Sequence, residues 1–134
     1  MKKEHKNINL HFCKKIQMLN HYENIMIITP ILSDDQAKKT AKEYENYLIK
    51  QNGKIVYQEH WGLKKLAYPI QKKKSGCYHL FEFLFHSHLV SDLDFKLRQD
   101  ERILRFLTVK LDKYGIKYAE KRRDKLLKND NNKL

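Results

Sequence analysis

The sequence predicts an α+β domain with a four-stranded antiparallel sheet and two helices on one face. Apolar or alternating segments predict strands at 22–29, 54–69, 76–85 and 102–111. Amphipathic segments predict one helix after the first strand and another after the third. Right-handed crossovers around each helix place the first and third strands in the centre. This order is that of the ferredoxin-like split βαβ sandwich (βαββαβ), which leaves the other sheet face free for a partner.

The first strand and first helix have clear boundaries. The segment YENIMIIT (22–29) is nearly continuously apolar in its second half and stops at Pro30, which is typical of a buried central strand. The following SDDQ is a capping-box pattern, in which Ser33 caps the helix and Gln36 reaches back. Gly53 is the expected stop of this helix. Its apolar stripe consists of Ala37, Ala41, Tyr44 and Leu48.

The second and third strands differ in character. The segment 54–69 predicts an edge strand that ends at Pro69, because proline cannot donate to a sheet ladder, and Gly62 marks a bulge or bend. The segment 76–85 alternates, as a strand does. Its phenylalanine-bearing face is assigned to the helices and contains Cys77, His79, Phe81, Phe83 and Phe85.

The second helix is expected to be capped by Ser87 or Ser91 and to end near Asp100. Its apolar stripe consists of Val90, Leu93 and Leu97. The last strand, at 102–111, carries apolar residues at both parities. Which of its sides faces the core therefore stays open.

The charge of the chain favours a polyanionic partner. The 134 residues allow one ordinary domain plus tails, and 28 basic against 16 acidic residues give a net charge of +12. Most of the excess lies at the ends, with +4 in residues 1–21 and +5 in residues 113–134, against +3 between them. Such a balance favours nucleic acid first and an anionic membrane second.

Both ends are expected to lack fixed structure in the free chain: 1–20 as a poorly ordered basic extension, and 113–134 as a mobile basic tail. For the extension, a mitochondrial transit peptide and a natural start at Met18 stay as alternatives. No apolar stretch approaches the ~20 residues of a membrane span. Two cysteines, Cys13 and Cys77, are too few for a disulfide framework and indicate a reducing compartment.

Lysines surround the apolar tetrapeptide LAYP in GLKKLAYPIQKKKSG (62–76). They predict phosphate contacts; the alternative is a solvated loop whose charges discourage edge-to-edge pairing of strands. Arginines near the junction of the second helix and last strand offer planar groups that match phosphate, although a surface ion pair with Asp100 or Glu101 stays open for Arg102. The candidate contacts are Lys64, Lys65, Lys72, Lys73, Lys74, Arg98, Arg102 and Arg105.

Aromatic and reactive residues predict no other chemistry. Trp61 and Tyr68 flank the lysine pair and could stack on bases, but packing is favoured for aromatics on a half-buried strand. The histidines and cysteines lack metal-site spacing, so no metal, cofactor or catalytic residue is predicted. Four unclustered glycines exclude a phosphate-binding loop. Cys77 and His79 occupy the aromatic slots of an RNA-recognition motif, which disfavours base reading by that mode.

Three segments, in order, resemble the family of bacterial small-subunit ribosomal protein six. WGLKKLAYPIQKKKSGCYHLFEF is similar to the family's basic motif and the strand after it. YENIMIITPILSDDQ is similar to its opening strand and capped helix, and LRQDERILRFLTVKLD to its closing junction. The resemblance covers about residues 20–112. It implies a structural, non-enzymatic and ribosome-bound protein whose folded part, 21–112, binds RNA. The cytoplasm is the expected location, and an organellar ribosome is the alternative.

The resemblance also implies the partners: the central domain of small-subunit ribosomal RNA and ribosomal protein eighteen, bound as a heterodimer. The tail residues Lys121, Arg122 and Arg123 are expected near phosphate on the assembled particle. The LAYP segment is expected to pack onto its own domain, so that the lysines are held towards phosphates. One alternative is a module whose main ligand is the protein partner, with RNA contact secondary. An acylphosphatase-like enzyme is a third possibility, although TPILS lacks the arginine that such a site requires.

Overall fold

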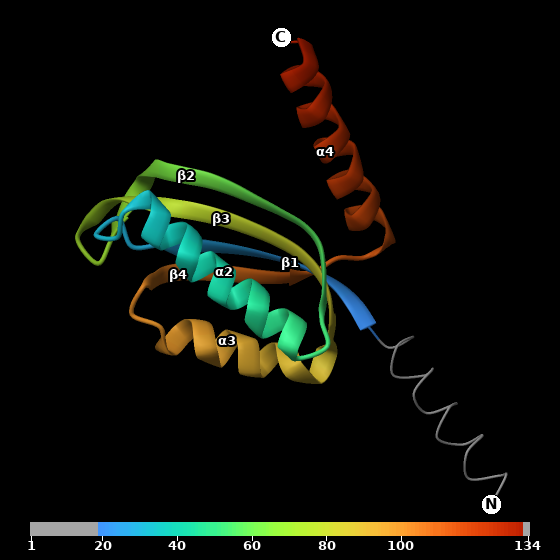
Figure 1. Cartoon of the computed structure of the whole chain (residues 1–134), viewed down its shortest axis with the longest axis horizontal. Coiled ribbons are helices and arrows are strands. Elements are labelled where there is room, and N and C mark those ends of the chain that lie inside the picture. The colour runs from blue at the N-terminus through green and yellow to red at the C-terminus, as the bar shows by residue number, and fades with distance from the viewer. Residues whose placement is uncertain (1–18, 133–134) are drawn as a thin grey trace, which may run out of the picture.

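The computed structural model describes residues 19–132 of the chain, with side chains through Leu126 (Figure 1). The expected extension at 1–20 therefore lies outside the described residues, apart from its end. The elements are β1 Leu19–Ile28, α2 Asp34–Lys50, β2 Lys54–Ile70, β3 Lys73–His86, the 3-10 turn η1 Ser87–Leu89, α3 Val90–Gln99, β4 Ile103–Lys110 and α4 Lys113–Asn132.

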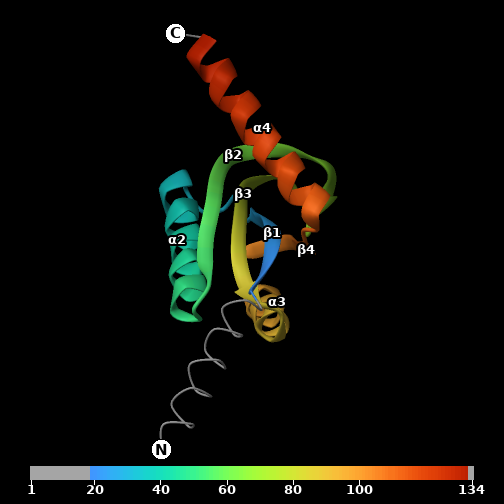
Figure 2. The same cartoon turned by 90° about the vertical axis from the view of Figure 1, so that its right-hand side faces the viewer.

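The sheet is antiparallel with the strand order β2-β3-β1-β4, which confirms β1 and β3 as the central strands. α2 and α3 cover one face, and the predicted ferredoxin-like fold is confirmed. Figure 2 shows α4 on the side of the sheet opposite to α2. The β2–β3 turn, the β1–α2 loop and the α3–β4 loop gather at one end of the sheet, on the left in Figure 1.

The core lies between the two helices and the phenylalanine-bearing face of the sheet. The predicted stripe of α2 is buried, as are Leu93 and Leu97 of α3. Opposite them, Phe81, Phe83 and Phe85 are at most 1 % exposed, which confirms that this face of β3 meets the helices. Removal of these side chains from water stabilises the fold by about 25 cal/mol per Å² of apolar surface.

The predicted side-chain cap is confirmed at the start of α2 but is wrong at the start of α3. At α2, Ser33 Oγ accepts from the Gln36 N–H at 3.2 Å, and Gln36 Oε1 accepts from the Ser33 N–H at 3.0 Å, so the capping box is confirmed. α3 has Leu89 at its N-cap and no side-chain cap, so the predicted cap by Ser87 or Ser91 is wrong. The η1 turn runs directly into α3, and its tighter hydrogen bonds replace a side-chain cap.

The end of α2 requires two residues. Asn52, and not Gly53, takes the left-handed conformation, with φ of 64°. Gly53 donates its N–H to Leu48 O at 2.8 Å. A Cβ at position 53 would lie 2.7 Å from that oxygen and 2.8 Å from the ring of Phe85. Glycine is therefore required at 53 by close packing.

β2 is an irregular edge strand. Its register against β3 shifts at Gly62, where φ is 76°, so the predicted bulge is confirmed. Another shift follows Lys65, because the LAYP segment bulges out between the pairs Lys65↔Ser75 and Ile70↔Lys73. Leu66 is 7 % exposed, but the next three residues are exposed. The expectation that all of LAYP packs onto the domain is wrong, because only Leu66 reaches it.

β4 carries apolar residues at both parities because residues of each parity contribute to the core. Phe106 pairs with Met26 and packs against the core. The register shifts between Ile27 and Ile28 of β1, and this irregularity lets Ile103 join the core as well, although its parity differs. Beyond the irregularity, Leu107 and Val109 are exposed and face away from the helices.

The tail forms the helix α4, whose first turn is capped by Asp112 Oδ1, which accepts a backbone N–H at 2.7 Å. Ala119 is buried, and Arg122 and Arg123 reach carboxylates of the sheet. The expectation of a free second sheet face is therefore wrong for the part that α4 covers. Mobility of this segment in the free chain stays a prediction.

Candidate nucleic-acid interface

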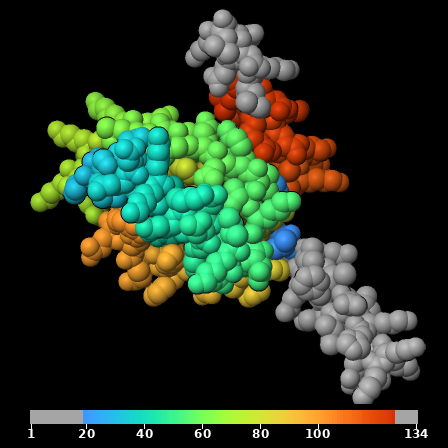
Figure 3. All heavy atoms as spheres, viewed as in Figure 1, coloured from blue at the N-terminus to red at the C-terminus, as the bar shows by residue number. Residues whose placement is uncertain are grey.

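The five lysines of the motif lie on the β2–β3 hairpin. Lys64, Lys65, Lys72 and Lys74 are exposed, and Lys73 is half-buried. None of them takes part in the ion pairs found among the described residues. Yellow-green atoms of this hairpin project from the left of the molecule in Figure 3. Ammonium groups that are not neutralised within the protein can displace counterions from an RNA backbone.

The tip of the hairpin is a strained two-residue turn. Ile70 pairs with Lys73, and the residues between them, Gln71 and Lys72, have φ of 50° and 66°. Turns with two positive φ angles normally take Asn-Gly. Other residues in this left-handed region cost roughly 1 kcal/mol or more each. Position 72 therefore carries a cation at some cost in stability.

Aromatic rings flank the lysine pair. Trp61 stacks on Tyr78 with ring centroids 6.1 Å apart, and Lys64 Nζ lies 5.1 Å from the centroid of the Trp61 ring. Packing, which the sequence favoured, is confirmed for Trp61. Tyr68 is 83 % exposed, so the packing interpretation is wrong for this residue. Its ring is free to stack on a base.

Sheet register places Arg105 on the same face as this stack. Tyr78 pairs with Gly62 on one side and with Ile27 on the other. Ile27 in turn pairs with Arg105, which is exposed. Adjacent strands lie about 4.8 Å apart, so this row spans roughly 14 Å. A single row thus runs from the base of the lysine hairpin to an arginine that is distant in sequence.

An apolar groove of about 280 Å³ lies beside Arg105. Its other lining residues are Ile25, Ile27, Phe106 and Leu107. Leu107 is 60 % exposed, and Val109 of the same strand is also exposed. Exposed apolar patches of this kind mark surfaces for contact with proteins or ligands. The base of the cationic hairpin and the apolar groove therefore lie on the same face of the sheet, the hairpin at the β2 edge and the groove over β1 and β4.

Arg98 and Arg102 lie in the helix layer instead. Arg98 is exposed near the end of α3. Arg102 contacts Asp100 and Glu43, each at 2.8 Å, so the ion-pair interpretation is confirmed and Glu43 is an unforeseen partner. Burial alone would raise the pKa of Asp100, but hydrogen bonds from Arg102 and Tyr44 outweigh it and lower the pKa to about 2.

The three candidate residues of the tail have different surroundings. Lys121 is exposed. Arg122 Nη2 lies 3.7 Å from Glu23, and Arg123 Nη2 lies 3.5 Å from Glu82. Phosphate contact by the two arginines stays a prediction, and it requires phosphate to replace these carboxylates.

Two further side chains among the described residues have shifted pKa values, Cys77 and His79. Burial, followed by the negative charge of Asp34, raises the pKa of the Cys77 thiol, which disfavours a thiolate nucleophile. Burial also lowers the pKa of His79 to about 4, with a smaller effect from His60.

No helix in the described part of the chain is long and apolar enough to cross a membrane.

Known proteins are similar to this chain in both sequence and fold. The family model described as ribosomal protein S6 matches residues 21–110. The small ribosomal subunit protein bS6 of Christiangramia forsetii is 50 % identical over 105 residues, which cover 78 % of this chain and 94 % of the relative. The protein of that name from Phocaeicola vulgatus is 47 % identical over 106 residues, covering 79 % and 93 %.

The fold also matches a solved structure. The crystal structure of 30S ribosomal protein S6 from Thermotoga maritima has a TM-score of 0.69 at 22 % identity, covering 79 % of this chain and 98 % of that one. At this identity the match supports the fold alone. The sequence matches support the function class, and they agree with the three resembling segments. The chain therefore belongs to the ribosomal protein S6 family, whose members are non-enzymatic structural proteins of the small ribosomal subunit.

Proposed function

We propose that the chain binds the central domain of small-subunit ribosomal RNA together with ribosomal protein eighteen, on a cytoplasmic ribosome. The observation that carries this proposal is the lysine hairpin, which projects from the domain with no internal carboxylate partner among the described residues. Its fixed position lowers the ordering entropy that phosphate contacts must overcome.

The hairpin offers two kinds of RNA contact. The lysines supply charge and release counterions, whereas Tyr68 offers an exposed ring for stacking on an unpaired base. Arg105, on the same sheet face, adds a guanidinium group that can contact a phosphate with two hydrogen bonds. Leu66 and the Trp61–Tyr78 stack hold the base of the hairpin against the sheet.

The protein partner has a separate candidate surface. The groove beside Arg105 is apolar, and Leu107 is exposed at its side. This groove favours a second candidate function, a module whose main ligand is ribosomal protein eighteen and for which RNA contact is secondary. Packing of an apolar side chain into the groove, or addition of a strand at an edge of the sheet, would suit such a contact.

The test measures binding of a central-domain RNA fragment over a range of salt concentrations, with and without ribosomal protein eighteen. The double variant Lys64→Ala/Lys65→Ala should weaken binding. Its slope of log affinity against log salt should be shallower by ~0.9 per lost phosphate contact. The matched control Lys39→Ala/Lys50→Ala removes the same charge from exposed positions on α2 and should leave the slope as in the parent.

The partner arm separates the two candidate functions. We expect weak RNA binding by the chain alone and cooperative binding when both proteins are present. Equal slopes for the hairpin variant and its control would contradict the assignment of the hairpin to RNA. If Leu107→Asp abolishes partner binding while the hairpin variant leaves affinity for the complete RNA–protein complex unchanged, protein contact is the main function.

A further inference from the structure

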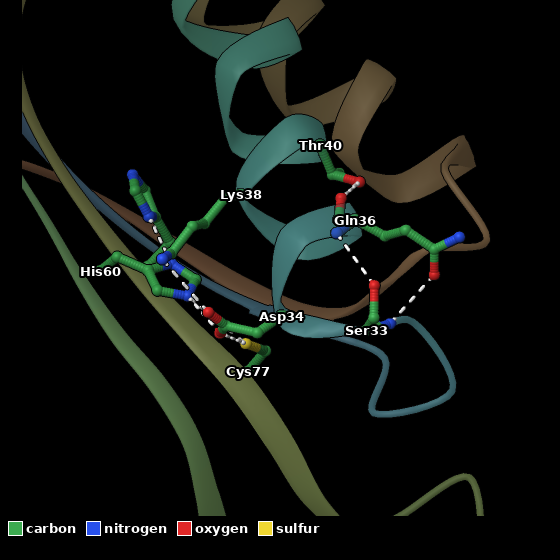
Figure 4. Close-up of polar contacts among 8 residues, drawn as sticks. Ser33, Asp34, Gln36, Lys38, Thr40, His60 and Cys77 are labelled. Carbon is green, nitrogen blue, oxygen red and sulfur yellow. Dashed lines mark hydrogen bonds and ion pairs between the residues drawn. The ribbon is translucent and has the colours of Figure 1, made fainter.

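A second cluster of polar side chains lies on the helix-facing side of the sheet, near the base of the lysine hairpin. It joins Asp34 in the first turn of α2, His60 beside the bulge of β2 and Cys77 near the start of β3 (Figure 4). Asp34 Oδ1, His60 Nε2 and Cys77 Sγ lie within 4.8 Å of one another. The three residues come from separate elements, so no spacing motif in the sequence indicates them.

The distances between these atoms suit a tetrahedral cation. Asp34 Oδ1 and His60 Nε2 are 2.9 Å apart, and Cys77 Sγ lies 3.7 Å from His60 Nε2 and 3.8 Å from Asp34 Oδ1. Ordinary zinc bond lengths at tetrahedral angles place an oxygen and a nitrogen ligand about 3.3 Å apart, and a sulfur about 3.5 Å from either. Shifts of about 0.4 Å or less would therefore bring all three atoms to bonding positions.

The surroundings of His60 resemble those of a metal-binding histidine. Its Nδ1 lies 3.1 Å from His79 Nδ1, and His79 Nε2 lies 3.2 Å from Gln58 Oε1. A neutral His79 that donates its Nε2–H to Gln58 presents a lone pair at Nδ1, which can accept the Nδ1–H of His60. Histidine ligands commonly donate their second N–H in this way, which fixes the ring and the nitrogen that faces the metal.

Access and charge are also suitable. The Asp34 side chain is 55 % exposed, so water can reach the cluster and supply a fourth ligand. Lys38 pairs with the other oxygen, Asp34 Oδ2, at 3.3 Å and leaves Oδ1 available. The Cys77 thiol releases its proton to water when the metal binds. The carboxylate and the thiolate then carry about two negative charges, which exceed the roughly +1.5 of Lys38 and the α2 N-terminus.

We propose that Asp34, His60 and Cys77 form a binding site for a borderline-soft divalent cation such as Zn²⁺, with water as the fourth ligand. Nitrogen, sulfur and carboxylate oxygen together match the ligand preference of zinc. The cation would connect α2, β2 and β3 at the base of the lysine hairpin. None of the proposed ligands is an RNA-binding residue named above.

The test titrates Co²⁺ and then Zn²⁺ into the reduced full-length chain after treatment with a chelator. We expect one equivalent of Co²⁺ with a thiolate-to-cobalt charge-transfer band, displaced by Zn²⁺. Cys77→Ser should abolish the band and weaken binding at least about 100-fold. The control Cys13→Ser removes the other cysteine and should leave both the band and the affinity unchanged.

Asp34→Asn provides a second variant that keeps the fold, because this side chain is exposed. It should weaken Co²⁺ binding at least about tenfold while the far-UV circular dichroism spectrum stays the same. Zn²⁺ should also raise the melting temperature of the parent chain but not that of Asp34→Asn. Absence of stoichiometric binding, or a band that survives Cys77→Ser and disappears in Cys13→Ser, would overturn the proposal.

Discussion

Replacement of Arg123 by alanine tests whether α4 is held on the sheet by charge. Arg123 Nη2 lies 3.5 Å from Glu82, a carboxylate on the sheet face opposite α2 and α3 that is only 1 % exposed. His21 Nε2 contacts the same carboxylate at 2.9 Å. Glu82 also pairs across the strands with Glu23, so two acidic residues face each other beneath α4.

The expected loss follows from this geometry. Removing one member of a fully buried ion pair costs about 3–5 kcal/mol, because the remaining charge is left unpaired. Glu82 would keep His21, and the Arg123 side chain is 19 % exposed, so water screens part of the interaction. The substitution also removes the contact of the Arg123 guanidinium with the ring of Tyr57, whose centroid lies 5.2 Å away. We therefore expect Arg123→Ala to lower the free energy of unfolding by about 1–3 kcal/mol.

The assay is urea unfolding of the full chain, with hydrogen exchange of α4 measured in parallel. Lys121→Ala is the matched control, because Lys121 is exposed on the same helix, and it should change stability by less than about 0.5 kcal/mol. Exchange in the first turns of α4 should be slow in the parent and fast in Arg123→Ala. Equal stabilities of the two variants, with fast exchange of α4 in the parent, would refute the docking and support the mobile tail that the sequence predicted.

Three further perturbations test separate parts of the structure. The folded pKa of Asp100, about 2, lies below the ordinary value of about 3.9, so its stabilising effect is complete above about pH 4 and is lost as the pH falls towards 2. With allowance for screening by water this loss is about 1–2 kcal/mol, and acid titration of unfolding should show it in the parent but not in Asp100→Asn. Lys72→Gly should raise the free energy of unfolding by up to about 1 kcal/mol, measured by urea unfolding, because glycine adopts a positive φ without strain. Lys72→Ala should give no such gain. Gly76→Ala should cost about 1–3 kcal/mol in thermal unfolding, because its Cβ would lie 2.3 Å from Ile27 Cγ2; a neutral result would show that Ile27 moves aside.

The fold could be predicted from the sequence because its signals are local. The capping box of Ser33 and Gln36 needs only four consecutive residues, and the alternation in β3 needs ten. Gly62 marked a bulge because an isolated glycine in a strand is rarely neutral. The predicted serine cap of α3 is wrong, because a serine near a helix start is a weak signal when a 3-10 turn can satisfy the same N–H groups.

The site was predictable where its residues are contiguous and unpredictable where register brings them together. The lysines of the hairpin stand together in the sequence. The row from Gly62 to Arg105 depends on three strand pairings, and the Asp34–His60–Cys77 cluster depends on how α2 lies over β2 and β3. The sequence favours packing for Tyr68, as for any aromatic on a half-buried strand, and the bulge that turns its ring outwards depends on the pairing of β2 with β3.

The tail shows that a count of basic residues does not reveal which of them are available to bind RNA. Residues 113–134 carry as much excess charge as any other part of the chain, and with no apolar stripe they predict a free basic arm. Two of their arginines instead neutralise Glu23 and Glu82, which the register of β1 and β3 brings opposite each other. These cations reach phosphate only if the carboxylates release them, whereas the hairpin lysines need no such exchange. If the proposed RNA contact is made, we expect the hairpin lysines to make it first and α4 to follow.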